Sequence, residues 1–157
     1  MKNFSTKRIG ILMVSGVYYP EVSGAAGQCR GLIHSLNKNI SFQVLATTRD
    51  QALVQQNRID NTPVFRLMVR SKNVIDYFKA FIKITIIFLS QRNKFQIVHF
   101  HGFSYKSTWL TVLSKMFNKK IIIKMTSFNH DDPCAIKERG FLIYYCFFKA
   151  DVYVGVK

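Results

Sequence analysis

Short runs of apolar residues alternate along the chain with segments whose apolar residues recur at helical spacing. The first run covers residues 9–14 and is rich in β-branched side chains. A short run that is apolar throughout is typical of a strand buried on both faces, as in a parallel sheet. The pattern predicts six such strands, at residues 9–14, 42–48, 63–69, 95–102, 120–125 and 151–156.

The segments between these strands predict helices at residues 24–36, 74–91, 105–117 and 135–149, with 49–61 as a loop that holds at most a short helix. This alternation is typical of a doubly wound, mostly parallel Rossmann-like sheet of about six strands, an α/β fold. In such sheets, ligands bind at the carboxyl ends of the strands, near the point where the strand order reverses. The segments expected there are 15–27, 101–104 and 126–132.

The first strand leads into a helix through a loop that ends in Gly24 and Gly27. Glycines at the start of a helix let backbone N–H groups approach an anion. The spacing matches neither the G-x-G-x-x-G nor the P-loop pattern. A plain tight turn without a ligand is therefore the alternative.

The chain of 157 residues is long enough for a single domain with one core. Its 23 Lys and Arg against 8 Asp and Glu give a net charge of +15. Such a surface attracts anionic lipids, phosphorylated ligands or nucleic acid. The basic residues are spread along the chain and no nucleic-acid-binding motif occurs, so we expect no nucleic-acid partner. We expect Arg66 and Lys124 to be solvated surface cations.

Three cysteines without a C-x-x-C pair indicate a reducing compartment and no disulfide or zinc site. The apolar segment 74–90 contains Lys79 and Lys83, and its uncharged part is shorter than the ~20 residues of a spanning helix. We interpret it as a core helix, with a helix at the membrane surface as the alternative.

Taken together in order, several segments resemble the N-terminal, acceptor-side domain of the family 4 glycosyltransferases, which have the two-domain GT-B architecture. The first strand, the pair Tyr19-Pro20 and the turn at 23–26 resemble the family's opening. The strand end His99-Phe100-His101-Gly102 matches the family's His-x-His pattern. The segments that carry the rest of the resemblance are 120–126, 131–133 and 150–156.

The resemblance implies sugar transfer from a nucleotide-sugar donor to a glycan or lipid-linked acceptor in surface polysaccharide synthesis, with retention of anomeric configuration, no cofactor and no obligatory metal. In this family the C-terminal domain holds the donor nucleotide. We expect 1–157 to be the acceptor-side domain with the donor domain absent, and to be inactive or nearly so by itself. It would then be an isolated half, a truncated gene product, or one subunit of a split enzyme whose partner chain carries the donor domain. The expected location is cytoplasmic, peripheral at the inner face of the membrane.

Two positions depart from the family pattern: Ser23 precedes Gly24 where the family has adjacent glycines, and Thr126 stands where the family often has histidine. His101 is the candidate for hydrogen bonding to a sugar or holding a proton. We expect His99 to point to the opposite face as a satisfied core residue. The full set of candidate substrate-binding residues is Gly24, Gly27, His101, Thr126, Asn129, Asp131 and Asp132.

For the two aspartates a structural role is the alternative, because Asp131 could cap the helix after Pro133. For the whole chain the alternative is a non-catalytic Rossmann-like binding module, or a truncated remnant, that docks on an anionic partner or membrane.

Overall fold

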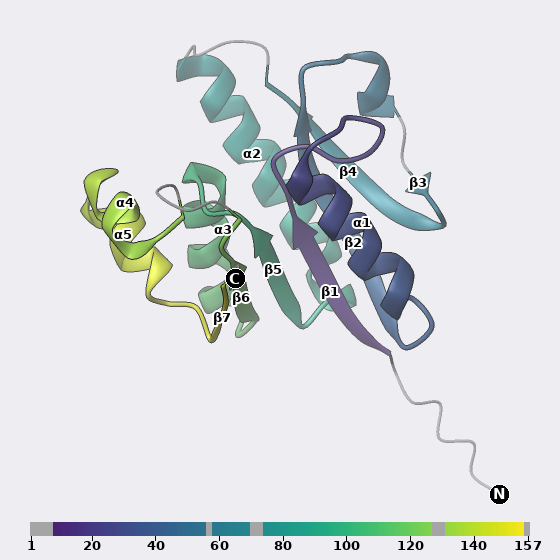
Figure 1. Ribbon diagram of the computed structural model, residues 1–157. Helices are drawn as coiled ribbons and strands as arrows, with labels where there is room; N and C mark the ends of the chain where they lie inside the picture. The colour runs from purple at the N-terminus through teal and green to yellow at the C-terminus, as the bar shows by residue number, and fades with distance from the viewer. Residues whose placement is uncertain (1–7, 56–57, 70–73, 127–130, 156–157) are drawn as a thin grey trace, which may run out of the picture.

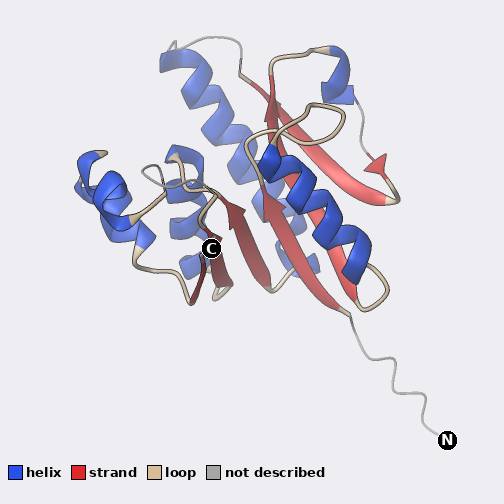
Figure 2. Cartoon of the chain, viewed as in Figure 1, coloured by secondary structure: helices blue, strands red, loops and turns tan. Residues whose placement is uncertain are grey.

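A seven-stranded sheet forms the centre of the computed structural model, which describes residues 8–55, 58–69, 74–126 and 131–155 (Figure 2). The strand order is β3-β4-β2-β1-β5-β6-β7, and every described pairing is parallel except that of β3 with β4. The strands are β1 Ile9–Val14, β2 Ile40–Thr48, β3 Arg58–Ile59, β4 Thr62–Met68, β5 Ile97–His101, β6 Lys120–Lys124 and β7 Val152–Val154.

Helices cover both faces of this sheet, with α1 in front of it and α2 behind it in Figure 1. The α-helices are α1 Gly24–Leu36, α2 Val74–Gln91, α3 Tyr105–Met116, α4 Pro133–Glu138 and α5 Phe141–Phe147. Two short 3₁₀ helices, η1 Ala52–Gln55 and η2 Arg92–Lys94, complete the described elements. The architecture confirms the predicted doubly wound α/β domain.

The two faces of β1 contribute to two separate cores, because successive side chains of a strand point to opposite faces. Leu12 and Val14 pack into the cluster that includes residues of α2, α3 and α5. Ile11 and Met13 pack into the cluster that includes Cys29 of α1. Burial on both faces explains why the strand is apolar at nearly every position.

The structure corrects the prediction at two places. The segment 49–61 contains a strand, β3, which pairs antiparallel with β4 through a turn at Asp60 and Asn61, both with positive φ. The predicted helix at 135–149 is two helices, α4 and α5, because Gly140 adopts a φ of 120° between them. The apolar periodicity runs on through this break, so the pattern of apolar residues alone does not reveal it.

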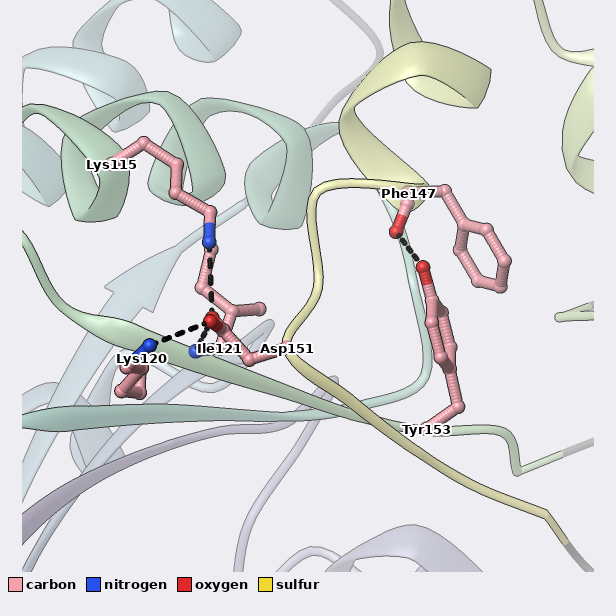
Figure 3. A network of polar contacts seen from close by, with 6 residues as sticks. All are labelled: Lys115, Lys120, Ile121, Phe147, Asp151 and Tyr153. Atoms are coloured by element: carbon pink, nitrogen blue, oxygen red, sulfur yellow. Dashed lines mark hydrogen bonds and ion pairs between the residues drawn. The ribbon is translucent and has the colours of Figure 1, made fainter.

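Asp151 fixes the chain where it enters β7 (Figure 3). Its carboxylate accepts hydrogen bonds from the backbone N–H of Ile121 (2.9 Å) and from the ammonium groups of Lys115 (3.0 Å) and Lys120 (3.1 Å). Partial burial acts to raise the pKa of Asp151, but these hydrogen bonds outweigh it and lower the pKa to about 2. Nearby, the hydroxyl of Tyr153 donates to the last carbonyl of α5 (2.7 Å).

Helix α2 buries Ile84 and Phe88 in the core, as the core-helix interpretation of segment 74–90 predicts. Its other side exposes large apolar residues, including Phe78 (66% exposed) and Ile86 (60% exposed). Within the described residues, none of the helices combines the length and the apolar character needed to cross a membrane.

Candidate functional site

A cleft of about 1010 Å³ opens at the carboxyl ends of the parallel strands. Its walls come from the loop after β1, the end of β2, the loop between β5 and α3, and Ala25 in the first turn of α1. The strand β1 lies between β2 and β5, so the chain order reverses beside it. The cleft therefore lies at the switch point where doubly wound sheets bind ligands.

The first turn of α1 is capped by Ser23, whose Oγ accepts a hydrogen bond from the N–H of Ala26 (3.0 Å). The N–H of Gly27 donates to the carbonyl of Ser23 (2.9 Å), so it does not face a ligand as the sequence predicted. Among the described residues, the N–H groups of Gly24 and Ala25 donate to no partner, and of these two residues Ala25 lines the cleft. A Cβ atom at Gly24 or Gly27 would meet nothing within 4 Å.

His99 and His101 lie on the same face of β5, with ring centroids 4.6 Å apart, so the expected opposite orientation of His99 is wrong. Residues two apart on a strand share a face. Burial, the charge of Lys124 and, for His101, the neighbouring His99 lower the histidine pKa values to about 4 for His99 and about 3 for His101. Both rings are therefore neutral near neutral pH.

His101 lines the cleft, and neither of its ring nitrogens has a hydrogen-bond partner in the described part of the chain. The Nε2 atom of His99 also lacks a partner there, so His99 is not the satisfied core residue that the sequence predicted. A neutral imidazole offers one donor and one acceptor. His101 is thus suited to hydrogen bonding with a neutral hydroxyl group and poorly suited to holding a proton.

Asp131 joins the loop after β5 to the loop after β6. Its Oδ1 accepts from the N–H of Phe103 (3.1 Å), and its Oδ2 accepts from the N–H (3.0 Å) and the Oγ1 (2.7 Å) of Thr126. Gly102 lies against this junction with a φ of +80°, and a Cβ there would lie 3.1 Å from Thr126 Oγ1 and 3.3 Å from Asp131 Oδ2. Asp131 and Thr126 therefore hold the cleft wall together, and glycine is needed beside them.

Asp132, not Asp131, is the N-cap of α4, accepting from the N–H groups of Cys134 and Ala135 at 3.0 Å each. It does not line the cleft, whereas His101, Thr126 and Asp131 do. Asn129 falls outside the described residues. The substrate contacts predicted for all of these positions stay predictions.

Lys106, in the first turn of α3, is a cleft residue that the sequence analysis did not single out. Its ammonium donates a hydrogen bond to the carbonyl of Ser15 at the end of β1. Burial lowers the pKa of Lys106 to about 8, and no carboxylate of the described residues forms an ion pair with it. The available signal was its position five residues after His101, at the start of a helix that follows a strand end.

Arg66 and Lys124 are not the solvated cations that the sequence predicted. Arg66 is buried in β4, and its guanidinium donates to the carbonyls of Tyr19 (2.5 Å) and Leu53 (3.3 Å). Burial lowers the pKa of Arg66. Lys124 is half-buried near the histidine pair. The described residues contain no group of three His, Cys, Asp or Glu that could hold a metal ion, and the three cysteines are free.

No protein-family model and no curated protein sequence matches this chain. Among solved structures, the chain is similar to a protein of Listeria monocytogenes named as a UDP-N-acetylglucosamine 2-epimerase, with a TM-score of 0.61 and 14% identity over 93% of this chain. It is also similar to Arabidopsis thaliana UGT89C1, solved with UDP-L-rhamnose, with a TM-score of 0.57 and 14% identity over 98% of this chain.

The chain spans about two-fifths of these neighbours, 39% of the first and 43% of the second. Identities this low bear on the fold alone. The chain thus has the Rossmann-like α/β fold of one domain of a GT-B-like protein.

Proposed function

We propose that this chain is the acceptor-side domain of a retaining glycosyltransferase that resembles family 4. The enzyme transfers a sugar from a nucleotide-sugar donor to a glycan or lipid-linked acceptor in surface polysaccharide synthesis. The ordered motif resemblance and the likeness to one domain of UDP-sugar-related proteins support this function. The observation that carries it is His101, a buried neutral imidazole without a partner among the described residues, at the wall of a switch-point cleft.

The catalytic unit in this proposal needs a second domain that holds the donor nucleotide, supplied by another segment or chain. Residues 1–157 by themselves then bind acceptor and do not turn over donor. The enzyme works in the cytoplasm at the inner face of the membrane, where lipid-linked acceptors are presented.

The second candidate is a non-catalytic module that docks on an anionic membrane. The exposed apolar residues of α2 and α5 favour it, with Phe78 66% and Phe141 82% exposed on a chain of net charge +15. Exposed apolar residues on a basic surface suit binding to anionic lipid.

Acceptor binding and sugar transfer separate the two candidates. The purified chain is titrated with short-chain analogues of lipid-linked monosaccharides, followed by ligand-observed NMR, and is then assayed for transfer with UDP- and GDP-sugars in the presence of a donor-domain chain. His101→Ala should abolish acceptor binding and transfer, whereas His34→Ala, an exposed histidine of α1, should change neither. Binding to anionic vesicles with no glycan binding and no transfer would leave only the second candidate.

A further inference from the structure

The ammonium of Lys106 and the N–H groups of residues 105–107, in the first turn of α3, form a positively charged corner of the cleft. No carboxylate of the described residues forms an ion pair with Lys106 there. We propose that this corner binds a phosphate group, so that the molecule in the cleft is a phosphate ester. The inference rests on the proposed function only for the identity of the molecule that carries the phosphate, which we assign to the acceptor.

Lys106 supplies the charge. Side chains in the first turn of a helix point back toward its N-terminus, which brings the ammonium of Lys106 to the carbonyl of Ser15 at the edge of the cleft. The carbonyl accepts one hydrogen bond from the ammonium, but it is neutral and does not balance the positive charge. Because buried charges are normally paired, a partly buried ammonium with no ion pair in the described part of the chain lacks an anion.

The end of α3 adds backbone donors at the same place. No acidic residue lies in its first turn, and the N-cap Ser104 makes no capping hydrogen bond with its side chain. Among the described residues, the N–H groups of residues 105–107 donate to no partner. The positive end of the helix dipole and these free N–H groups favour an anion, whereas a lysine there adds further positive charge.

Buried polar atoms next to this corner are an independent indication of a ligand. His101 is only 5% exposed and lines the cleft, yet neither ring nitrogen is bonded within the described residues. A buried imidazole normally hydrogen-bonds through both of its ring nitrogens, one as a donor and one as an acceptor. The large majority of buried polar side-chain atoms are hydrogen-bonded, so the two unpaired ring nitrogens of His101 indicate that a polar molecule belongs in the cleft that Lys106 also lines.

Neither acidic residue of the cleft, Glu21 or Asp131, forms an ion pair with Lys106. Both carboxylate oxygens of Asp131 accept hydrogen bonds from Phe103 or Thr126. The charge of Glu21 acts on Arg66, whose pKa it raises against the effect of burial. A phosphate suits this corner because its oxygens can accept from the helix N–H groups and the ammonium at once.

The experiment uses the full chain labelled with ¹⁵N and titrated with four probes: inorganic phosphate, glucose 1-phosphate, UDP and uncharged glucose. We expect phosphate and glucose 1-phosphate to shift the amide signals of residues 105–107 and to raise the pKa of Lys106, measured on its Nζ signal. Glucose alone should not do so. Absence of these shifts with every phosphate probe overturns the inference.

Variants connect the shifts to Lys106. Lys106→Met should weaken glucose 1-phosphate binding by roughly tenfold or more, as the loss of a charge-assisted contact predicts. Lys106→Arg should retain most of the binding, and Lys83→Met, at an exposed lysine of α2, should bind like the wild-type chain. Equal affinity of Lys106→Met and the wild type overturns the inference. If Lys106→Met does not fold, the pKa of Lys106 in the wild-type chain provides the test. A rise in this pKa on adding glucose 1-phosphate supports the inference, and an unchanged pKa overturns it.

The probes also separate the phosphate site from the function. Saturation by UDP with no response to glucose 1-phosphate would assign the phosphate to the nucleotide and overturn the assignment to the acceptor. Phosphate binding without sugar transfer in the reconstituted enzyme would support the site and refute the proposed function. Transfer to an uncharged acceptor, without any response to the phosphate probes, would support the proposed function and refute the phosphate site.

Discussion

Asp131 and Asp132 are neighbouring carboxylates with different structural roles, which makes the same substitution at each a sharp test. Asp131→Asn replaces one of two oxygens that together accept three hydrogen bonds from Phe103 and Thr126, at 3.1, 3.0 and 2.7 Å. Whichever way the amide is turned, its NH₂ group faces a backbone N–H group. In one orientation that group is the N–H of Phe103, a residue that is 1% exposed.

The expected cost follows from those contacts. A hydrogen bond to a charged group contributes about 1.5–3 kcal/mol, and a buried donor left unpaired costs about 1–3 kcal/mol. With one or two bonds lost, the free energy of unfolding should fall by about 3–5 kcal/mol. At about 2–4 °C per kcal/mol for a domain of this size, Tm should fall by roughly 6–20 °C. Asp132→Asn should change stability by less than about 0.5 kcal/mol, because asparagine is an equally good N-cap.

The assay is urea and thermal unfolding of the wild type and the two variants, followed by far-UV circular dichroism near neutral pH. If Asp131→Asn and Asp132→Asn unfold together with the wild type, the junction between the two loops does not stabilise the domain. If both are destabilised to the same extent, the different roles assigned to the two carboxylates are wrong.

Three further predictions concern stability. The pKa values of His99 and His101, about 4 and 3 in the folded chain against 6.5 when unfolded, mean that the unfolded chain binds protons first, so stability should fall as the pH drops from 6.5 toward 4. Each histidine accounts for roughly 2 kcal/mol at pH 5, and a flat unfolding profile over this range would contradict the burial of the pair. Gly102→Ala should lower the free energy of unfolding by about 1–3 kcal/mol because Gly102 has a positive φ. The measurement is urea unfolding, with Gly24→Ala as the control, since a Cβ at Gly24 would have no atom within 4 Å. Asp151→Asn should destabilise near neutral pH, and its effect should shrink as the pH falls from 3.8 toward 2, since the carboxylate contributes only while ionised; a cost independent of pH would mean that ionisation is irrelevant.

Most of the sheet could be predicted because its strands carry short continuous apolar runs, as in β1 and in the three isoleucines between the terminal lysines of β6. The strand β3 was missed because it is two residues long and has no apolar run. The break at Gly140 was missed because apolar residues continue at helical spacing on both sides of it. Local pattern therefore predicts long elements well and short or interrupted ones poorly.

The candidate site was predicted less completely, since its chemistry depends on tertiary contacts. The location of His101 followed from its place at a strand end. The burial of Lys106 and Arg66 did not, because a lone cation in a helix or strand has the same local pattern whether it is solvated or buried. The orientation of His99 follows from strand geometry alone, because residues two apart on a strand point to the same face. Placing His99 on the face opposite to His101 was therefore wrong.

The position of β1 between β2 and β5 also bears on how the chain folds during synthesis. The strand pairs with β2 after about one helix, whereas its pairing with β5 joins Ile11 to Ile97, 86 residues apart. During synthesis the pairing with β5 cannot form until that strand has been made, and closing so long a loop costs more entropy than closing the short one to β2. We expect the core that contains Ile11, Met13 and Cys29 to form first on the ribosome. Until β5 and α3 are made, one edge of β1 is unpaired, and Leu12 and Val14 lack the β5 and α3 residues of their cluster. Such an edge is prone to aggregation, so the yield of folded protein should depend on how quickly translation reaches β5.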